Sequence, residues 1–369
     1  MKKLLSLLLA SALAISMLAG CGGSASDGGE KGEVYNVCNL VNGNLGDKSF
    51  FDSAKSGLDK LEADGVIKAK TIEMGATDAD QPKWLETLYE VSESGEYDLI
   101  IVGTYQMPDY LKEVAEKYPD QKYLIYDDTT YVGVCPNVVN MSFRQNDLGY
   151  MVGVFAAAMT TSGYDKMNDD AVIGFLGGVD SPVINDFLYG YLAGAQSVNP
   201  DVKVDTRYVT NYYDTAYGKE LALSMINDKK ADIVWGVGGA AGNGGAEAAQ
   251  ETGKAWFIGV DSDQEATFGA ELAAITLTSG LKNVGDGICW FFEQWAQGNE
   301  FWGQEINLGI AEGGVGIVTD KNFASVPQDV QDAVLAAQEA IVAGEITVPS
   351  ALTDGGNDAA RALRDSMQP

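Results

Sequence analysis

The chain has 369 residues, of which 24 are Lys or Arg and 53 are Asp or Glu, so its formal net charge is −29. It contains no histidine, which removes His-dependent catalytic triads, imidazole zinc sites and the commonest general base. An acidic surface repels polyanions, so nucleic acid and anionic lipid headgroups are poor partners, although solubility alone also accounts for the acidity.

The first twenty residues have the pattern of a secretory signal peptide. Lys2 and Lys3 precede an apolar run, Leu4 to Leu18, that is too short to span a bilayer as a stable helix. The run ends in Leu-Ala-Gly-Cys, which resembles a bacterial lipobox, so we expect cleavage after residue 20 and acylation of Cys21. Two or more acyl chains would anchor the protein to a membrane. The alternative is a simple secreted protein with Cys21 in its core.

Residues 21–32 are rich in glycine and serine and predict a flexible tether behind Cys21. The folded body then begins near residue 33 and has about 337 residues, more than one compact core usually holds, so two domains are expected. Without Lys2 and Lys3 the 24 basic residues become 22, and against 53 acidic residues the net charge is −31.

Short β-rich runs alternate with stretches of helical period along this body. The predicted strands cover residues 34–41, 68–74, 98–103, 122–126, 137–142, 171–176, 202–209, 232–237 and 255–260. The predicted helices cover residues 50–61, 84–91, 110–118, 184–197, 217–227 and 246–252, with a further one from about residue 147. This alternation requires right-handed crossovers and parallel sheets with helices on both faces, so the sequence predicts two α/β units in series.

Ligands of open α/β sheets bind beyond the carboxyl ends of the strands, so the residues after each predicted strand matter most. Four such segments are rich in amides, carboxylates, glycines and aromatic rings: residues 42–50, 126–128, 238–245 and 261–264. We expect them to converge in a cleft between the two units. Their chemistry indicates a small-molecule site and not a catalytic constellation.

Signals for a cofactor or a metal are weak. Cys38, Cys135 and Cys289 have no CxxC spacing, and Cys38 and Cys289 lie in apolar runs that predict burial. Gly236 to Ala241 satisfies GxGxxA after a strand, with Asp261 downstream, which is the pattern of a dinucleotide-binding loop. An NAD-dependent enzyme therefore remains a remote alternative. We expect no cofactor and no metal.

Several segments resemble the basic membrane lipoprotein family, the substrate-binding components of ABC transporters for purine nucleosides. They are Gly46–Phe50, Ser142–Gln145 with Gly149–Gly153, Tyr208–Asp214 with Gly218–Glu220, and Ala231–Gln264. The resemblance extends from about residue 34 to 345. It implies a type I periplasmic-binding-protein fold, in which two doubly wound parallel-sheet lobes are joined by a three-strand hinge.

The resemblance also implies the domain boundaries. Lobe 1 would comprise residues 33–141 and 275–302, and lobe 2 would comprise residues 142–274 and 303–345. The last segment, residues 346–369, is expected to be a peripheral tail.

Nine residues are expected to bind ligand: Asn42, Asp47, Phe50, Asp127, Tyr212, Gly238, Gly239, Asp261 and Lys282. The resemblance implies that Phe50 and Tyr212 stack on the two faces of the base and that Asp261 and Lys282 hold the ribose hydroxyls. Asn42 would read the base and Asp127 would be a second acid near it, while the two glycines let the backbone approach the ligand. Structural roles are the alternative: a helix staple for Phe50, a turn for Asp261, a solvated charge for Lys282.

Two positions depart from the family pattern, since Val41 replaces an aspartate and Phe51 replaces an asparagine that many members have. These changes bear on which base is bound. A sugar-binding or sensing receptor of the same fold is the nearer alternative, with Trp84, Trp235 or Tyr105 stacked on a pyranose.

The expected function is capture of a purine nucleoside between two lobes and its delivery to an ABC transporter permease. No bond is broken, so the protein is not expected to be an enzyme. It would act on the extracytoplasmic face of the cell membrane, held there by its lipid.

Overall fold

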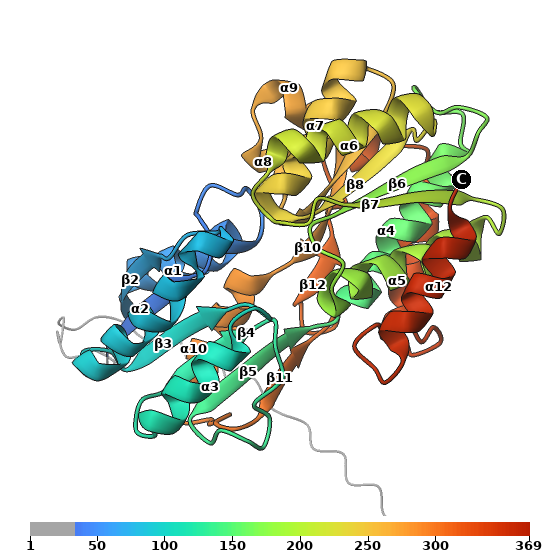
Figure 1. The fold of residues 1–369 in the computed structure, drawn as a ribbon. Coiled ribbons are helices and arrows are strands. Elements are labelled where there is room, and N and C mark those ends of the chain that lie inside the picture. The colour runs from blue at the N-terminus through green and yellow to red at the C-terminus, as the bar shows by residue number, and fades with distance from the viewer. Residues whose placement is uncertain (1–33) are drawn as a thin grey trace, which may run out of the picture. The chain divides into compact units, whose positions relative to one another are not determined.

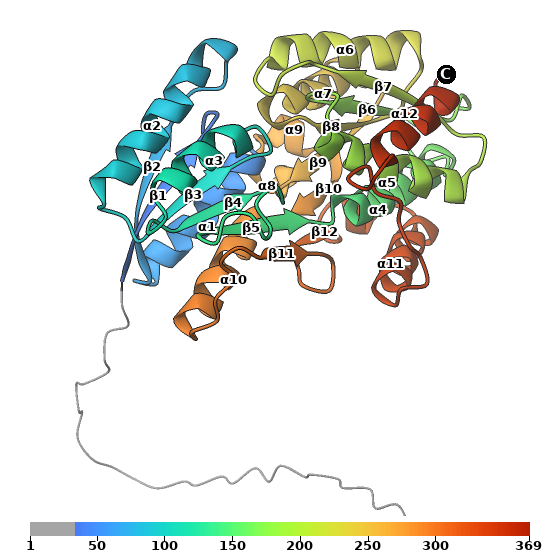
Figure 2. The ribbon, with the colours of Figure 1, turned by 60° about the horizontal axis from the view of Figure 1, so that its bottom comes forward.

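A computed structural model describes residues 34–369 of the chain. The predicted signal peptide, the acylation of Cys21 and the tether lie outside the described residues. Residues 34–369 form two twisted sheets that lie side by side, each covered by helices (Figures 1 and 2).

The first sheet has six parallel strands in the order β11-β5-β4-β3-β1-β2. They are β1 (Tyr35–Val41), β2 (Ile67–Glu73), β3 (Leu99–Gly103), β4 (Tyr123–Tyr126), β5 (Val138–Phe143) and β11 (Glu305–Leu308). Its helices are α1 (Phe50–Ala63), η1 (Asp78–Asp80), α2 (Gln81–Ser94), α3 (Pro108–Lys117) and α10 (Val284–Ala296). Alternate residues of β1 face opposite layers: Val37 packs with Leu58 of α1, whereas Leu40 packs with Leu88 of α2.

The second sheet has the order β12-β10-β9-β8-β6-β7, and its edge strand β12 runs antiparallel to β10. The strands are β6 (Val172–Gly177), β7 (Lys203–Tyr208), β8 (Ile233–Val237), β9 (Trp256–Asp261), β10 (Thr276–Lys282) and β12 (Val315–Ile317). The elements around it are α4 (Gln145–Thr160), α5 (Pro182–Val198), α6 (Thr215–Asp228), α7 (Gly239–Thr252), α8 (Gln264–Thr267), α9 (Ala270–Ala273), η2 (Phe323–Ser325), α11 (Gln328–Val342) and α12 (Gly356–Met367). Helices α4 and α5 pack together, as do α6 and α7 (Figure 1).

This architecture confirms the predicted fold class of two doubly wound parallel-sheet lobes. The chain passes between the sheets three times: after β5, after β10 and between β11 and β12. The predicted boundaries of the returning segments are wrong in two places. Strand β10, assigned to lobe 1, pairs with β9 in the second sheet, and β11, assigned to lobe 2, pairs with β5 in the first. Edge pairing of this kind depends on distant partners and not on local pattern.

The C-terminal residues are less peripheral than the sequence predicts. Helix α12 packs against α5 beside the second sheet, where both views place it (Figures 1 and 2). Its Ala360 and Met367 are buried, and so are Val348 and Ala351 in the segment that leads to it. The end of the chain is therefore part of the packed second half of the molecule.

Helix α7 begins at Gly239, seven residues earlier than predicted. The sequence reads residues 238–245 as a glycine-rich loop, because glycine is the poorest helix former after proline. In the fold these glycines bring α7 very close to its neighbours. A Cβ on Gly244 would lie 2.4 Å from a backbone atom of α6, and one on Gly242 would lie 3.0 Å from Gly236 in β8. Close packing here outweighs the low helix propensity.

Cys38, Cys135 and Cys289 are free and buried, which confirms the expectation for Cys38 and Cys289. Over residues 34–369, no helix has both the length and the apolar character that crossing a membrane requires.

Helices α4 and α5 approach each other through glycines. A Cβ on Gly153 would lie 2.1 Å from the carbonyl oxygen of Tyr191, and one on Gly190 would lie 2.0 Å from that of Asn146. Real Cβ atoms do not come so close to backbone, so a larger residue must push the helices apart. The position of α5, which borders the site described below, depends on this contact.

We therefore expect Gly153→Ala to destabilise the protein by about 1–3 kcal/mol, the usual cost of overpacking. Urea denaturation followed by circular dichroism measures the free energy of unfolding. Gly269→Ala is the matched control, because no atom lies within 4 Å of its added Cβ, and it should change stability by less than about 0.5 kcal/mol. Equal stability of the two variants would contradict the close approach of α4 and α5.

Candidate functional site

A cavity lies where the carboxyl ends of the two sheets face each other. It holds about 840 Å³ of space not filled by atoms, a volume that includes the part open to solvent. Side chains and backbone from both sheets line it. The lining residues are Asn42, Gly43, Asn44, Asp47, Phe50, Phe51, Ala76, Thr104, Tyr105, Gln106, Asp127, Val183, Ile184, Phe187, Tyr212, Tyr213, Val237, Gly238, Gly239, Ala240, Asp261 and Lys282.

All nine residues predicted from the sequence lie in this cavity. The first sheet and its loops contribute Asn42, Asp47, Phe50 and Asp127, and the second sheet and its loops contribute Tyr212, Gly238, Gly239, Asp261 and Lys282. The rule that ligand sites form beyond the carboxyl ends of parallel strands therefore locates the cavity in this chain.

The start of α1 holds Phe50 at the cavity. The Asp47 carboxylate accepts hydrogen bonds from the backbone N–H groups of Ser49 (3.0 Å), Phe51 (2.9 Å) and Asp52 (3.2 Å). These groups have no partner inside the helix, and a carboxylate at this end also complements the helix dipole. Burial raises the pKa of Asp47 even though the three N–H groups oppose the rise. Asp47 thus fixes the first turn of α1 and with it the Phe50 ring.

Lys282, the last residue of β10, is the centre of the charged part of the cavity. Its side chain is 1% exposed and forms an ion pair with Asp127, which follows β4 in the other sheet. The Lys282 Nζ also lies 5.3 Å from the ring centroid of Phe50, 5.4 Å from that of Phe143 and 5.2 Å from that of Phe187. A buried ammonium among aromatic rings is stabilised by their π faces, but it needs the carboxylate to offset the loss of water.

Asp261, the last residue of β9, is buried beside this pair. Its Oδ2 accepts a 2.5 Å hydrogen bond from the Ser49 hydroxyl, which comes from the first sheet's side of the cavity. Burial raises the pKa of Asp261 to about 7, although the charge of Lys282 and the bond from Ser49 lower it. A group that titrates near neutrality in a closed cavity can both donate and accept hydrogen bonds.

Both cavity carboxylates at strand ends have an uncommon backbone conformation. Asp127 has φ 68° and Asp261 has φ 65°, the left-handed region that residues other than glycine rarely adopt. Such strain is retained where the surrounding structure fixes it, and it clusters at binding sites. Both residues with this backbone conformation line the cavity.

The two halves touch each other around the cavity. The Tyr105 and Tyr212 hydroxyls lie 2.7 Å apart, one after β3 and the other after β7. The Asn243 amide donates to the Asp47 carbonyl at 3.0 Å, and the Gln264 amide donates to the Lys48 carbonyl at 3.0 Å. These bonds join loops of opposite sheets, so the conformation described is one in which the halves are closed on each other.

The first-sheet end of the cavity carries neutral amides. The Asn42 Nδ2 donates to Thr104 Oγ1 at 3.4 Å and to Gln106 Oε1 at 3.3 Å, while its Oδ1 has no partner. Val41 is fully buried and does not line the cavity, whereas Phe51 does and packs over Gly43. This end is therefore apolar and amide-rich, with no carboxylate at position 41.

Several residues that line the cavity are not among the nine predicted from the sequence. Thr104 and Gln106 follow β3, and the same rule that found the other loops would have found them if it had been applied to that strand. Val183, Ile184 and Phe187 form an apolar wall from the first two turns of α5, a helix that the sequence placed two residues too late.

Of the three aromatic residues that could stack on a pyranose, two lie in the core and one lines the cavity. Trp84 and Trp235 are 2% and 0% exposed and donate their indole N–H groups to the carbonyls of Gly75 and Gly259. They belong to the core, so the alternative in which Trp84 or Trp235 stacks on a pyranose is wrong. Tyr105 does line the cavity.

The profile of one protein family, described as ABC transporter substrate-binding protein PnrA-like, matches residues 34–351. Basic membrane protein A of Borreliella burgdorferi is 32% identical over 354 residues, which cover 95% of this chain and 96% of that protein. The chain therefore belongs to this family. The recognised resemblance is confirmed, and the protein is a substrate-binding component of an ABC transporter, not an enzyme.

Two further similarities agree. The protein named ABC transporter nucleoside-binding protein BmpA of Lactococcus lactis is 31% identical over 370 residues, covering 95% of this chain and all of that protein. A solved ABC transporter solute-binding protein of Aeropyrum pernix has a TM-score of 0.75 and 25% identity, with 90% of this chain and 99% of that one covered. The class is extracytoplasmic, and the dinucleotide-binding alternative for Gly236 to Ala241 is set aside.

The raised pKa of Asp261 predicts a pH-dependent stability. At pH values between about 4 and 7 the folded protein holds a proton that the unfolded chain, with an ordinary Asp pKa of about 3.9, has released. The free energy of unfolding should therefore fall as pH rises through this window. Asp261→Asn cannot titrate and should lose at least about 1 kcal/mol less than the wild type between pH 4.5 and 7.

Urea denaturation of the unliganded protein at several pH values measures this difference. Asp320→Asn, which removes an exposed carboxylate outside the cavity, is the control and should follow the wild type. Parallel profiles for Asp261→Asn and the wild type would contradict the assignment of the buried proton to Asp261.

Proposed function

We propose that this protein captures a purine nucleoside in the cavity between its two sheets and presents it to an ABC transporter permease. The observation that carries the proposal is the convergence of Phe50, Tyr212, Asp261 and Lys282 on one cavity within a chain of this family. The name of the Lactococcus lactis relative, a nucleoside-binding protein, supports the same ligand class.

The aromatic residues suit a flat, uncharged base. Phe50 reaches the cavity from the first sheet and Tyr212 from the second, so a base between them would contact a ring on each face. Stacking on an aromatic side chain contributes about 1–3 kcal/mol per base and requires no charge on the ligand. Asn42 and Gln106 supply amide groups at the first-sheet end, where the base edge would lie.

The charged residues suit a pentose. Asp261 accepts hydrogen bonds from neighbouring hydroxyls in its ionised form, and the Lys282 ammonium donates to the same oxygens. Gly238 and Gly239 allow the backbone of the β8–α7 turn to approach the sugar without a side chain between. Asp47 acts one step away, because it holds the turn that carries Phe50.

Closure of the two halves completes the capture. The bonds between Tyr105 and Tyr212 and between Ser49 and Asp261 join opposite halves at the cavity, so a ligand held by both sides favours the closed state. The closed form is then the one that docks on the permease.

Isothermal titration of unfolded, dialysed and refolded protein with inosine, guanosine, adenosine and free sugars tests the ligand class. We expect heat from at least one purine nucleoside and none from the sugars. Heat from sugars alone would replace the nucleoside with a sugar ligand of the same fold.

Substitutions of Tyr212 test whether its ring stacks on the ligand. Tyr212→Ala removes a stacking ring and should weaken nucleoside binding about fivefold to a hundredfold. Tyr212→Phe keeps the ring and loses the hydroxyl with its contacts to Tyr105 and Ser181, so it should lose less affinity than Tyr212→Ala. Tyr217→Ala removes an exposed ring of α6 outside the cavity and is the control for loss of a tyrosine. Unchanged affinity in Tyr212→Ala would remove this ring from the site.

The membrane anchor is proposed from the sequence alone. Cys21 would be acylated after cleavage of the signal peptide and would tether the binding domain through residues 22–32. We expect Cys21→Ser to move the protein from the membrane fraction to the medium or periplasm. Phase separation in detergent and intact mass measurement distinguish the lipidated form, and a Cys21→Ser protein that stays in the membrane fraction would contradict the anchor.

A further inference from the structure

The turn between β6 and α5, residues 178–182, borders the cavity and is held from outside by the end of the chain. It begins beside the Tyr212 ring: a Cβ on Gly178 would lie 2.4 Å from a carbon of that ring. It ends at Pro182, after which Ile184 and Phe187 form the apolar wall of the cavity. The position of this turn therefore determines where two parts of the lining lie.

Ser181 ties the same turn to the tyrosine pair that joins the two halves. Its hydroxyl accepts a hydrogen bond from the backbone N–H of Ile184 at 3.5 Å and caps α5. Burial raises the pKa of Tyr105 and of Tyr212, and the nearby Ser181 hydroxyl offsets part of each rise. A shift of the turn would therefore change the contact of Gly178 with the Tyr212 ring and the interaction of Ser181 with the Tyr212 hydroxyl.

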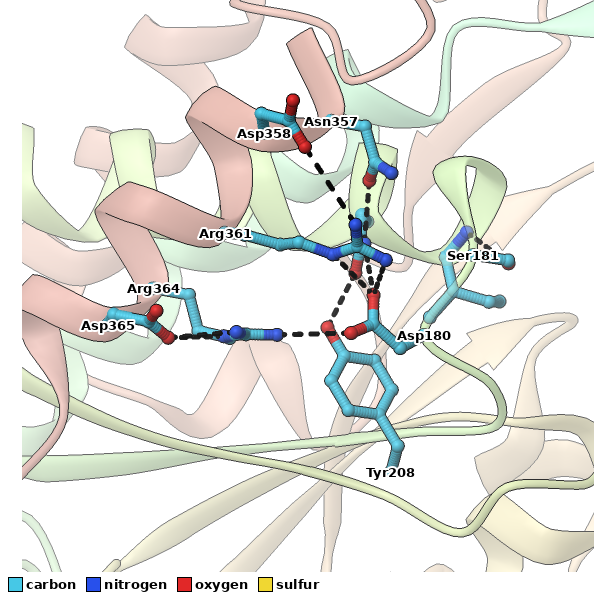
Figure 3. Close-up of polar contacts among 10 residues, drawn as sticks. Asp180, Ser181, Tyr208, Asn357, Asp358, Arg361, Arg364 and Asp365 are labelled. Carbon is cyan, nitrogen blue, oxygen red and sulfur yellow. Dashed lines mark hydrogen bonds and ion pairs between the residues drawn. The ribbon is translucent and has the colours of Figure 1, made fainter. Parts of the chain in front are cut away.

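Asp180, the residue before Ser181, is held by two arginines of helix α12 (Figure 3). Its Oδ1 accepts hydrogen bonds from the Arg361 Nε at 3.0 Å and the Arg361 Nη2 at 2.9 Å. Its Oδ2 accepts a longer bond, 3.4 Å, from the Arg364 Nη1. The two arginines are three residues apart on one face of α12, so both reach the same carboxylate, as Figure 3 shows.

Asn185, in the first turn of α5, forms a second junction with the end of the chain. It is fully buried, and its Nδ2 lies 2.7 Å from Asp180 Oδ1 and 2.7 Å from the Oδ1 of Asn357 at the start of α12. Its own Oδ1 accepts a 2.5 Å hydrogen bond from the Tyr208 hydroxyl at the end of β7. Asn185 thus joins α5, α12 and the strand that leads to Tyr212.

Asp186 forms a third junction, one residue further along α5. It is 1% exposed, and its Oδ1 accepts hydrogen bonds from the Ser350 hydroxyl at 2.7 Å and from the Ala351 N–H at 2.8 Å. Asn146 of α4 binds the same segment, since its Nδ2 donates to the Val348 carbonyl at 3.1 Å. Polar groups buried at this depth hold the segment in one place, because each would lose its only partners on release.

We propose that the C-terminal segment, residues 348–367, is a positioning element of the ligand cavity. Its grip on Asp180, Asn185 and Asp186 keeps the 178–182 turn, and through it Tyr212 and the wall of α5, in the arrangement that binds ligand. As far as nucleoside affinity is concerned, this inference rests on the function proposed above. The family profile ends at residue 351, so α12 lies beyond the segment that it matches.

We expect that the contacts of Arg361 and Arg364 with Asp180 can be removed without unfolding the protein. The Asp180 and Arg361 side chains are 36% and 38% exposed, and ion pairs as open as this one contribute little to global stability. Arg364, which is 18% exposed, makes only the longer contact of 3.4 Å with Asp180. A double variant, Arg361→Gln with Arg364→Gln, removes both charges from α12 and leaves the buried contacts of Asn185 and Asp186 in place. The double variant therefore tests whether α12 positions the 178–182 turn, and not whether the protein folds.

The matched control is the double variant Lys203→Gln with Lys254→Gln, which removes two positive charges from exposed positions in the same half of the molecule, away from the cavity. Titration with the nucleoside that the wild type binds should give a dissociation constant at least fivefold higher for the arginine variant and within twofold of wild type for the control. The temperature is kept at least 20 °C below the melting point of each protein.

Hydrogen exchange of the unliganded proteins gives a readout that needs no ligand. In the arginine variant, backbone amides of residues 178–187 and 209–213 should exchange at least tenfold faster than in the wild type, with the first sheet unchanged. Wild-type exchange in these two segments would overturn the positioning role, and so would wild-type affinity. If the wild type binds no nucleoside, the proposed function fails while the exchange measurement still decides the role of the C-terminal segment.

Discussion

The ion pair between Lys282 and Asp127 is the interaction on which the site depends. Lys282 ends a strand of the second sheet, Asp127 follows a strand of the first, and both side chains are almost fully buried. A buried ammonium without a partner costs several kcal/mol, so these two strand ends must face each other for the closed form to exist. Burial raises the pKa of Asp261, and the charge of Lys282 lowers it in part, so the pKa of this carboxyl is about 7. One pair therefore joins the halves and offsets part of the effect of burial on the neighbouring acid.

Local pattern predicted β1 to β9 closely, because buried parallel strands are short apolar runs bounded by turn residues, whereas β10, β11 and β12 were not among the predicted strands. Val34–Val41 was expected where β1 covers Tyr35–Val41, and residues 232–237 where β8 covers Ile233–Val237. The nine site residues followed from the resemblance together with the position of strand ends. Eight of the nine lie within ten residues of the end of a predicted strand, so local pattern alone marks their segments, whereas Lys282 was taken from the resemblance only.

What could not be predicted depends on distant contacts. The assignment of β10 and β11 to opposite sheets is decided by pairing with β9 and β5, and β11 lies more than 160 residues from its partner. The helical start of α7 depends on the close approach of α6 and β8, which overrides the low propensity of its glycines. The junction of Arg361 with Asp180 spans 181 residues, and neither residue stands out in its own neighbourhood. Such features become visible only when the halves of the chain are assembled.

The charged groups in the cavity restrict the class of ligand more than the fold does. Among the residues that line it, Lys282 is the one cation, and it is already paired with Asp127, while Asp47 is held by three backbone N–H groups. Nothing in this lining offers a free positive group to a phosphate, and the net charge of −29 on the whole chain repels one at a distance. The cavity therefore favours an uncharged ligand over its phosphorylated form. Val41 is buried outside the lining, so in the proposed complex the base edge would meet the amides of Asn42 and Gln106. Discrimination between purines would then rest on neutral hydrogen bonds and not on a carboxylate at position 41.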